Sequence, residues 1–161
     1  DVVFDSTYDE YMFVFTDIAP ATNAQDFTFQ VNATDDAGGD YDTSLITSST
    51  FQAYLSEAGA AALEYATAVD QAQAAGFQII SRSIGSGADE SCAGILHLFS
   101  PASTTYVKHF YARMNGYYQT GSMTLTLFTA GYINDTTAID EIRFKFASGN
   151  FDGVIQMYGI S

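Results

Sequence analysis

The sequence predicts an all-β protein, an antiparallel, jelly-roll-like β-sandwich of eight or nine strands. Aromatic residues make up 15% of the chain and are all Phe or Tyr, which favour pleated surfaces. Apolar runs of strand length recur between clusters of Gly, Asn, Asp and Ser. At most one segment has helical character, so the crossover helices of a parallel sheet are missing. At 161 residues, positions 1–161 fit a single domain.

The first two strands are predicted at residues 9–18 and 27–32. The run "DEYMFVFTDI" ends before Pro20 and Asn23, which are typical of turns. In the second strand, apolar side chains at positions 27, 29 and 31 alternate with polar ones, as in a strand with one buried face. We expect these two strands to pair with each other.

The middle of the chain is predicted to hold a loop at residues 35–44, a short strand at 51–55 and an unusual Ala-rich insertion at 58–75. The insertion has helix-compatible spacing and is followed by Gly76, a plausible C-cap. One interpretation is therefore a short helix. The other is a long extended loop whose small residues lie flat over a sheet, and the sequence does not separate the two.

The second half contains further strands and an expected C-terminal β-hairpin. The strands are predicted at 77–82, 92–99, 106–114 and 124–128. Residues 142–146 then alternate between apolar and charged side chains, and 154–160 form a second apolar run. Gly149, Asn150 and Gly153 lie between these runs and tolerate the positive φ of a tight turn. The expected core contains Phe13, Phe15, Phe29, Ile142, Phe144 and Phe146.

The charge balance excludes some partners. Five basic against nineteen acidic side chains give a net charge of −14, which repels nucleic acid and anionic membranes. No apolar run approaches the ~20 residues of a membrane span. The acidic residues are dispersed, as on solvated faces, although they would also attract a basic partner. The chain begins at Asp1 instead of Met, so we interpret its start as a truncated end that lacks an attachment segment.

Signatures of catalysis are missing from the sequence. It has no phosphate-binding glycine loop, no metalloprotease motif and no serine nucleophile elbow, so we predict no enzyme and no cofactor. His97 and His109 lie on neighbouring predicted strands, but their apolar neighbours favour packing over metal binding. The single cysteine, Cys92, opens an apolar strand and is expected to be buried.

Two segments carry weak binding signals. The first is a Gly-containing acidic loop whose oxygen ligands suit calcium, although its spacing is not that of an EF-hand and a solvated turn is the alternative. Its ligands would be Asp35, Asp36, Asp40 and Asp42. The second is "NGYYQTG" at residues 115–121, where Tyr117 or Tyr118 could stack against a glycan. Adjacent strand residues point to opposite faces, so at most one of these tyrosines can face the ligand.

The two ends of the chain carry the most specific motifs. The opening "FDSTYDEYMFVFTDIAPATNAQDFTFQVN" and the closing "INDTTAIDEIRFKFASGNFDGVIQMYGIS" resemble a recurring virion-protein domain of tailed bacteriophages, common in marine and freshwater phages. The central "AGGDYDTS" and "SPASTTYVKHFYAR" are similar to that family as well. Residues 58–75 depart from it, being more Ala-rich than the Ser/Gly-rich stretch usual there.

The resemblance implies a jelly-roll-like sandwich on the virion surface, either a head decoration or a head or tail fibre component. Its partners would be capsid or neighbouring fibre subunits, and its activity would not be catalytic. We expect a homo-oligomer, with a trimer ahead of a monomer, because symmetric copies multiply weak contacts. The alternative is a receptor- or glycan-binding module of a tail fibre that mediates host adsorption.

Overall fold

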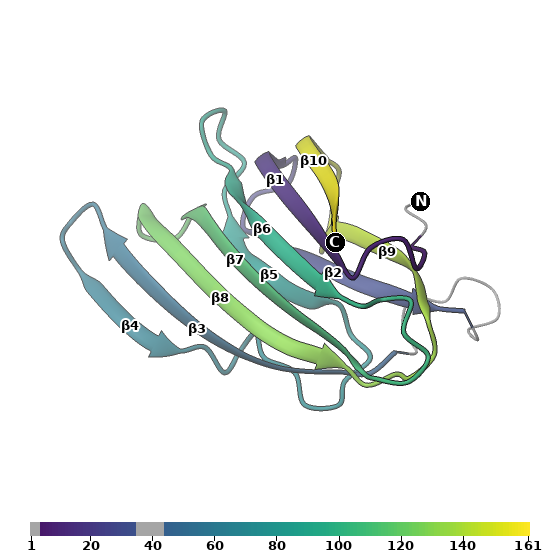
Figure 1. Ribbon diagram of the computed structural model, residues 1–161. Helices are drawn as coiled ribbons and strands as arrows, with labels where there is room; N and C mark the ends of the chain where they lie inside the picture. Colours follow the sequence, from purple (N-terminus) through teal and green to yellow (C-terminus); the bar gives the residue numbers. More distant parts are fainter. Residues whose placement is uncertain (1–3, 35–43) are drawn as a thin grey trace.

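A computed structural model describes residues 4–34 and 44–161, which fold into ten strands (Figure 1). The described part contains no helix, and hence none long and apolar enough to cross a membrane. The strands are β1 (Glu10–Pro20), β2 (Gln25–Ala33), β3 (Ile46–Ser56), β4 (Ala61–Tyr65), β5 (Gln78–Ile84), β6 (Cys92–Phe99), β7 (Lys108–Tyr118), β8 (Met123–Ile133), β9 (Ile139–Phe146) and β10 (Phe151–Ile160).

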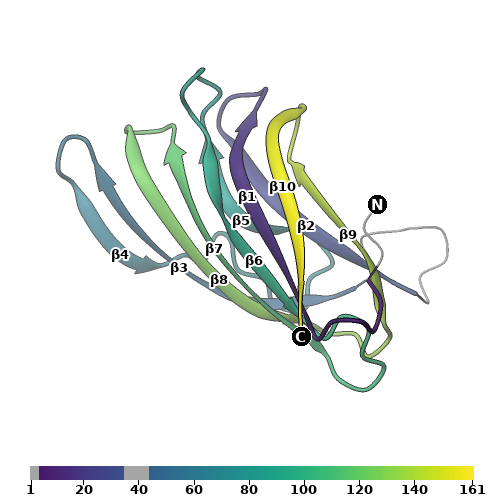
Figure 2. The ribbon, with the colours of Figure 1, turned by 45° about the horizontal axis from the view of Figure 1, so that its top comes forward.

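The strands form a large and a small antiparallel layer. The large layer has the order β10-β1-β6-β7-β8-β3-β4, and the small layer has the order β5-β2-β9. One bridge between Ile84 and Tyr118 connects them. The Phe15 ring of β1 lies 5.3 Å from Phe27 of β2 and 5.1 Å from Phe144 of β9, although β1 pairs with neither strand. The layers therefore face each other, and the predicted antiparallel all-β sandwich is confirmed (Figure 2).

The pairing follows the pattern of a folded-over hairpin. β1 pairs with β10, β2 with β9, and β3 with β8, so three pairs are nested about one midpoint of the chain. Nested pairs of this kind arise when a long two-stranded ribbon wraps into two layers, which is how a jelly roll is built. The chain departs from full nesting in its middle, where β7 pairs with β6 and β8.

The two expected hairpins at the ends of the chain are wrong. β1 does not pair with β2, and β9 does not pair with β10, because both connections cross from one layer to the other (Figures 1 and 2). The two crossings lie side by side, since the Ala21 N–H donates to the Asn150 carbonyl at 2.8 Å. Gly149, at a φ of 78°, lets one crossing approach Thr22 of the other. Alternation shows which face of a strand is buried, but not which strand lies beside it.

The main core lies between the layers where β1, β6 and β7 face the small sheet. Phe13, Phe15 and Phe29 are at most 1% exposed, and Ile142 and Phe146 are also buried. Phe144 is half-buried and packs against the same cluster. All six residues of the expected core therefore belong to one cluster, with the Phe27 ring in contact with four other Phe rings.

The Ala-rich insertion is extended, so the helix interpretation is wrong. Residues 61–65 form the edge strand β4, which pairs with β3 and accounts for one strand beyond the expected number. Ala66 and Val69 then pack on Leu125 and Leu127, on the inner side of the large sheet. The open edge of β3 offers backbone partners at every second residue, and these tertiary contacts override the helix propensity of alanine.

Candidate binding surfaces

The side of the large sheet that faces away from β2, β5 and β9, hereafter the outer face, carries exposed apolar side chains. Phe51 and Leu55 of β3 are 49% and 52% exposed, and Leu63 and Tyr65 of β4 are 74% and 54% exposed. Phe51 lies opposite Tyr65 in the register, so these side chains form one patch. Tyr158 and Ile160 of β10 add apolar surface at the far edge. An exposed patch of this kind commonly marks an interaction site.

Four rings cross the outer face in a row, here called the aromatic ladder: Phe51, Phe128, Tyr111 and His97. Phe51 and Phe128 have ring centroids 5.1 Å apart at 10°, and His97 and Tyr111 have centroids 4.5 Å apart at 17°. Coplanar rings cannot approach this closely, so these rings stack face to face. Tyr111 and Phe128 are parallel at 6.1 Å. The ring faces that lie against each other within the ladder are therefore covered, and the rings inside the row present their edges to solvent.

The outer face also lacks acidic side chains at its centre. β3, β6, β7 and β8 contain no Asp or Glu, although the chain has nineteen acidic residues. Glu10 of β1 is the nearest carboxylate in the register and forms a short contact with the His97 Nδ1. Arg113 and His109 are exposed on β7. In a protein of charge −14, the centre of this surface therefore adds no carboxylate of its own to the repulsion between copies.

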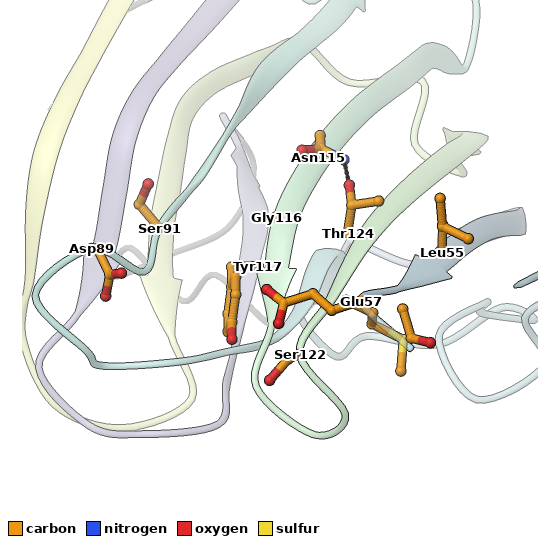
Figure 3. A pocket seen from close by; sticks show the side chains of 11 residues that line it. Leu55, Glu57, Asp89, Ser91, Asn115, Gly116, Tyr117, Ser122 and Thr124 are labelled. Carbon is orange, nitrogen blue, oxygen red and sulfur yellow. Dashed lines mark hydrogen bonds between the residues drawn. The ribbon is translucent and has the colours of Figure 1, made fainter. Parts of the chain in front are cut away.

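A hollow of about 480 Å³ lies at one end of the outer face, around Tyr117 (Figure 3). It is called the Tyr117 hollow below. Leu55 and Met123 supply apolar surface, while Glu57 and Asp89 supply carboxylates. Its polar lining further includes Ser56, Ser91, Asn115, Ser122 and Thr124.

The local structure of β7 and β8 fixes the groups around Tyr117. The Asn115 side-chain NH2 donates to the Thr124 hydroxyl at 2.8 Å and to the Thr126 hydroxyl at 3.1 Å, so the Asn115 side-chain carbonyl oxygen is the group that can accept from a ligand hydroxyl. Within the described residues, no other ring contacts that of Tyr117. A half-buried tyrosine beside hydroxyl, amide and carboxylate groups can stack on an apolar sugar face and bond its hydroxyls.

Tyr118 points to the opposite side of the sheet, as strand geometry requires for a residue next to Tyr117. It lies in a separate hollow of about 400 Å³ with Arg82, Tyr54 and Glu64. The Arg82 guanidinium is 5.9 Å from the Tyr118 ring centroid, and Tyr118 packs on the cluster of Leu125 and Leu127. Of the predicted pair, Tyr117 alone faces the outer hollow.

The remaining candidates are the possible metal ligands and the single cysteine. Asp35, Asp36, Asp40 and Asp42 lie outside the described residues. His97 is buried against Tyr111, whereas His109 is exposed on the outer face. No cluster of three or more metal-ligating side chains occurs in residues 4–34 and 44–161. Cys92 is buried at the start of β6, as expected, and desolvation raises the pKa of its thiol to about 12.

The comparisons with known proteins identify no relative. No protein-family model, no curated protein and no solved structure matches this chain.

Sequence reasoning missed the outer face. A signal was nevertheless present, because four strand-forming segments of a highly acidic chain, three of them consecutive, contain no Asp or Glu. From the sequence alone, Phe51 and Phe128 could be identified as residues that favour strands. That they lie side by side on one face follows only from the register of β3 and β8.

Proposed function

We propose that this chain is a non-enzymatic structural domain displayed on the surface of a tailed-bacteriophage particle. There it would serve as a head decoration or as a head or tail fibre component that binds capsid or neighbouring subunits. The opening and closing sequence motifs support the phage setting. The outer face, with its acid-free central strands and its exposed Phe51, Leu55 and Leu63, supports an assembly role, and it is the observation that carries the proposal.

An assembly role agrees with the distribution of chemistry in the molecule. Asp5, Tyr11 and Tyr65, whose pKa values are shifted by hydrogen bonds and burial, lie outside the hollows on the outer face. Active sites usually concentrate perturbed groups in a cleft. The outer face instead offers a broad apolar surface, which is the chemistry of protein association.

The test is quantitative mass spectrometry of purified particles that contain this chain, combined with its position in a particle reconstruction. A decoration would occur in proportion to the capsomers, and a fibre component would occur at far lower copy number at a vertex or the tail. Absence of the chain from particles purified to constant composition would overturn the proposal.

A second candidate function is glycan recognition at the Tyr117 hollow, during host adsorption. The observation that favours it is a tyrosine ring free of aromatic neighbours beside Asn115 and two carboxylates. Tyr117→Ala should abolish adsorption of particles, whereas Tyr117→Phe should retain much of it because the stacking face remains. Tyr106→Ala, at a more exposed tyrosine outside the hollow, is the control. Unchanged adsorption by Tyr117→Ala would exclude this site.

A further inference from the structure

We infer that the outer face of the large sheet is the docking surface for a second copy of this chain, in a two-fold, face-to-face dimer. The aromatic ladder of one copy would lie against that of the other. The inference deepens the proposed structural role, because it names a partner for the surface on which that role rests.

The apolar content of the outer face is the first argument. Leu63 is 74% exposed and Tyr65 is 54% exposed, and both lie beside Phe51 and Leu55 on neighbouring strands. Monomeric proteins rarely expose a contiguous apolar patch of more than a few hundred Å². The four side chains lie on a strand pair at the edge of the sheet and keep about half or more of their surface exposed, although Phe51 stacks on Phe128 and the Tyr65 hydroxyl donates to Asp70 at 2.7 Å. Burial against another apolar surface would remove this area from water.

Charge identifies the second copy as the occupant. Two copies of a chain with net charge −14 repel each other through most orientations. A two-fold contact brings the same patch of both copies together, so the acid-free strands β3, β6, β7 and β8 would meet the acid-free strands of the partner. A basic partner would instead be attracted to the acidic remainder of the surface. The outer face is therefore better suited to a copy of itself than to a charged protein.

The size of the face is sufficient for a stable dimer. Strands lie about 4.8 Å apart and rise about 3.4 Å per residue, so the seven strands of the face, including the acid-bearing β1, β4 and β10, cover roughly 1,000 Å² at about ten residues each. A specific interface needs about 800 Å² from each partner. Sheets also pack face to face through side chains that interdigitate at a spacing of about 10 Å, and the outward ring edges of the ladder suit that arrangement.

The ladder geometry argues against a sugar as the occupant of the same surface. Glycan stacking needs a ring face that is open to solvent. In the pairs Phe51–Phe128 and Tyr111–His97, the inner ring faces lie against each other at 5.1 and 4.5 Å. The Tyr117 hollow lies at the end of this face, so a dimer and a glycan site need not exclude each other.

Sedimentation equilibrium of the full chain over a wide concentration range tests the inference. We expect a dimer mass that increases with concentration, and at least a tenfold loss of association for Phe51→Glu and for Leu63→Glu. Tyr106→Glu, 73% exposed but outside the sheet, is the matched control and should associate normally. A monomer at every concentration, a trimer, or a dimer that neither variant weakens would overturn the inference.

Two further measurements test the dimer if a variant folds poorly: the salt dependence of association and an intermolecular distance between spin labels. Screening reduces repulsion between the acidic remainders of the two copies, so association should tighten as salt rises. Association weakened by salt would indicate contact between acidic and basic surfaces and would overturn the proposal. A spin label at Ser49→Cys, exposed on the outer face, should give an intermolecular dipolar signal, since Cys92 is buried and unlabelled. Loss of that signal under dimer-forming conditions would place the contact elsewhere.

The two proposals can fail separately. A monomeric chain would remove the face-to-face dimer but leave the copy-number test of the particle untouched. A dimeric chain that is absent from purified particles would remove the virion role but leave the interface in place.

Discussion

The two halves of the sandwich are built from different chemistry, although they share the same large sheet. Where β1, β6 and β7 face β2 and β9, an apolar cluster rich in Phe fills the space between two layers. Where β3, β4 and β8 extend past the small sheet, the segment after β4 provides most of the inner cover (Figures 1 and 2). These regions are called the thick half and the thin half below.

The thin half replaces apolar volume with satisfied polar groups. Its buried apolar cluster consists only of Ala66, Val69, Leu125 and Leu127. Beside it, the fully buried Gln78 accepts from the Ser48 hydroxyl at 2.7 Å and donates to the Val69 carbonyl at 2.9 Å. The Thr50 and Thr129 hydroxyls bond each other at 3.1 Å. The comparison teaches that one sheet can be stabilised by hydrophobic burial at one end and by a hydrogen-bond network at the other.

The largest expected effect comes from opening a cavity in the thick half. Phe27 is fully buried and contacts Phe15, Phe146 and Phe151, so Phe27→Ala should lower the free energy of unfolding by about 3–5 kcal/mol. Urea denaturation measures the change. Tyr106→Ala, at an exposed side chain, is the control and should change stability by less than about 0.5 kcal/mol. A similar small change for Phe27→Ala would contradict the description of the thick half.

A smaller effect is expected from breaking the polar network of the thin half. Gln78→Leu keeps the volume but leaves the Val69 carbonyl and the Ser48 hydroxyl short of a partner, at a cost of about 1–3 kcal/mol. Limited proteolysis should detect earlier cleavage within residues 66–77 than in the wild type. Gln156→Leu, at an exposed glutamine of β10 outside this network, is the control. Protection of that segment equal to the wild type would show that Gln78 does not hold it.

The sequence predicted the thick half far better than the thin half. Phe13, Phe15 and Phe29 occur at alternating positions, and two-residue periodicity identifies a buried strand face from local information alone. The thin half contains Ala-rich residues 58–75, whose local preference for helix is overridden by pairing of β4 with β3. No local signal describes that pairing, because the partner strand is chosen by the whole fold.

Because strand pairing cannot be predicted from local sequence, the C-terminal connection and the outer face were also predicted incompletely. Gly149 lies in the connection between β9 and β10, as expected, whereas Gly153 lies inside β10. Turn residues do not distinguish a hairpin within one sheet from a crossing between layers. Tyr117 and Tyr118 were separable by strand geometry, and the structure places them in different hollows. The aromatic ladder depends on the register of four strands, which a single sequence does not reveal.

The crossings at the end of the thick half should respond to a single methyl group. Gly149 has a φ of 78°, and a Cβ there would lie 2.5 Å from the Thr22 hydroxyl oxygen, so Gly149→Ala should cost about 1–2 kcal/mol. Gly76→Ala is the matched control, because nothing lies within 4 Å of its added Cβ. Thermal unfolding of both variants measures the difference. Equal midpoints would show that the adjoining crossings tolerate the added methyl group.

The Cys92 thiol reports on the thick half through the pH dependence of stability. Its pKa rises from 9.0 to about 12 because burial disfavours the thiolate. The unfolded chain therefore loses this proton first, and the contribution of Cys92 to stability should be present below about pH 9 and decline up to about pH 12. Cys92→Ala should flatten that part of the stability profile.

At neutral pH, reaction of Cys92 with a thiol reagent should follow opening of the thick half. Gln78→Leu should accelerate cleavage of residues 66–77 far more than it accelerates labelling of Cys92, if the two halves open separately. Equal acceleration of both reactions would mean that the halves open as one cooperative unit, because labelling and cleavage would then report the same event.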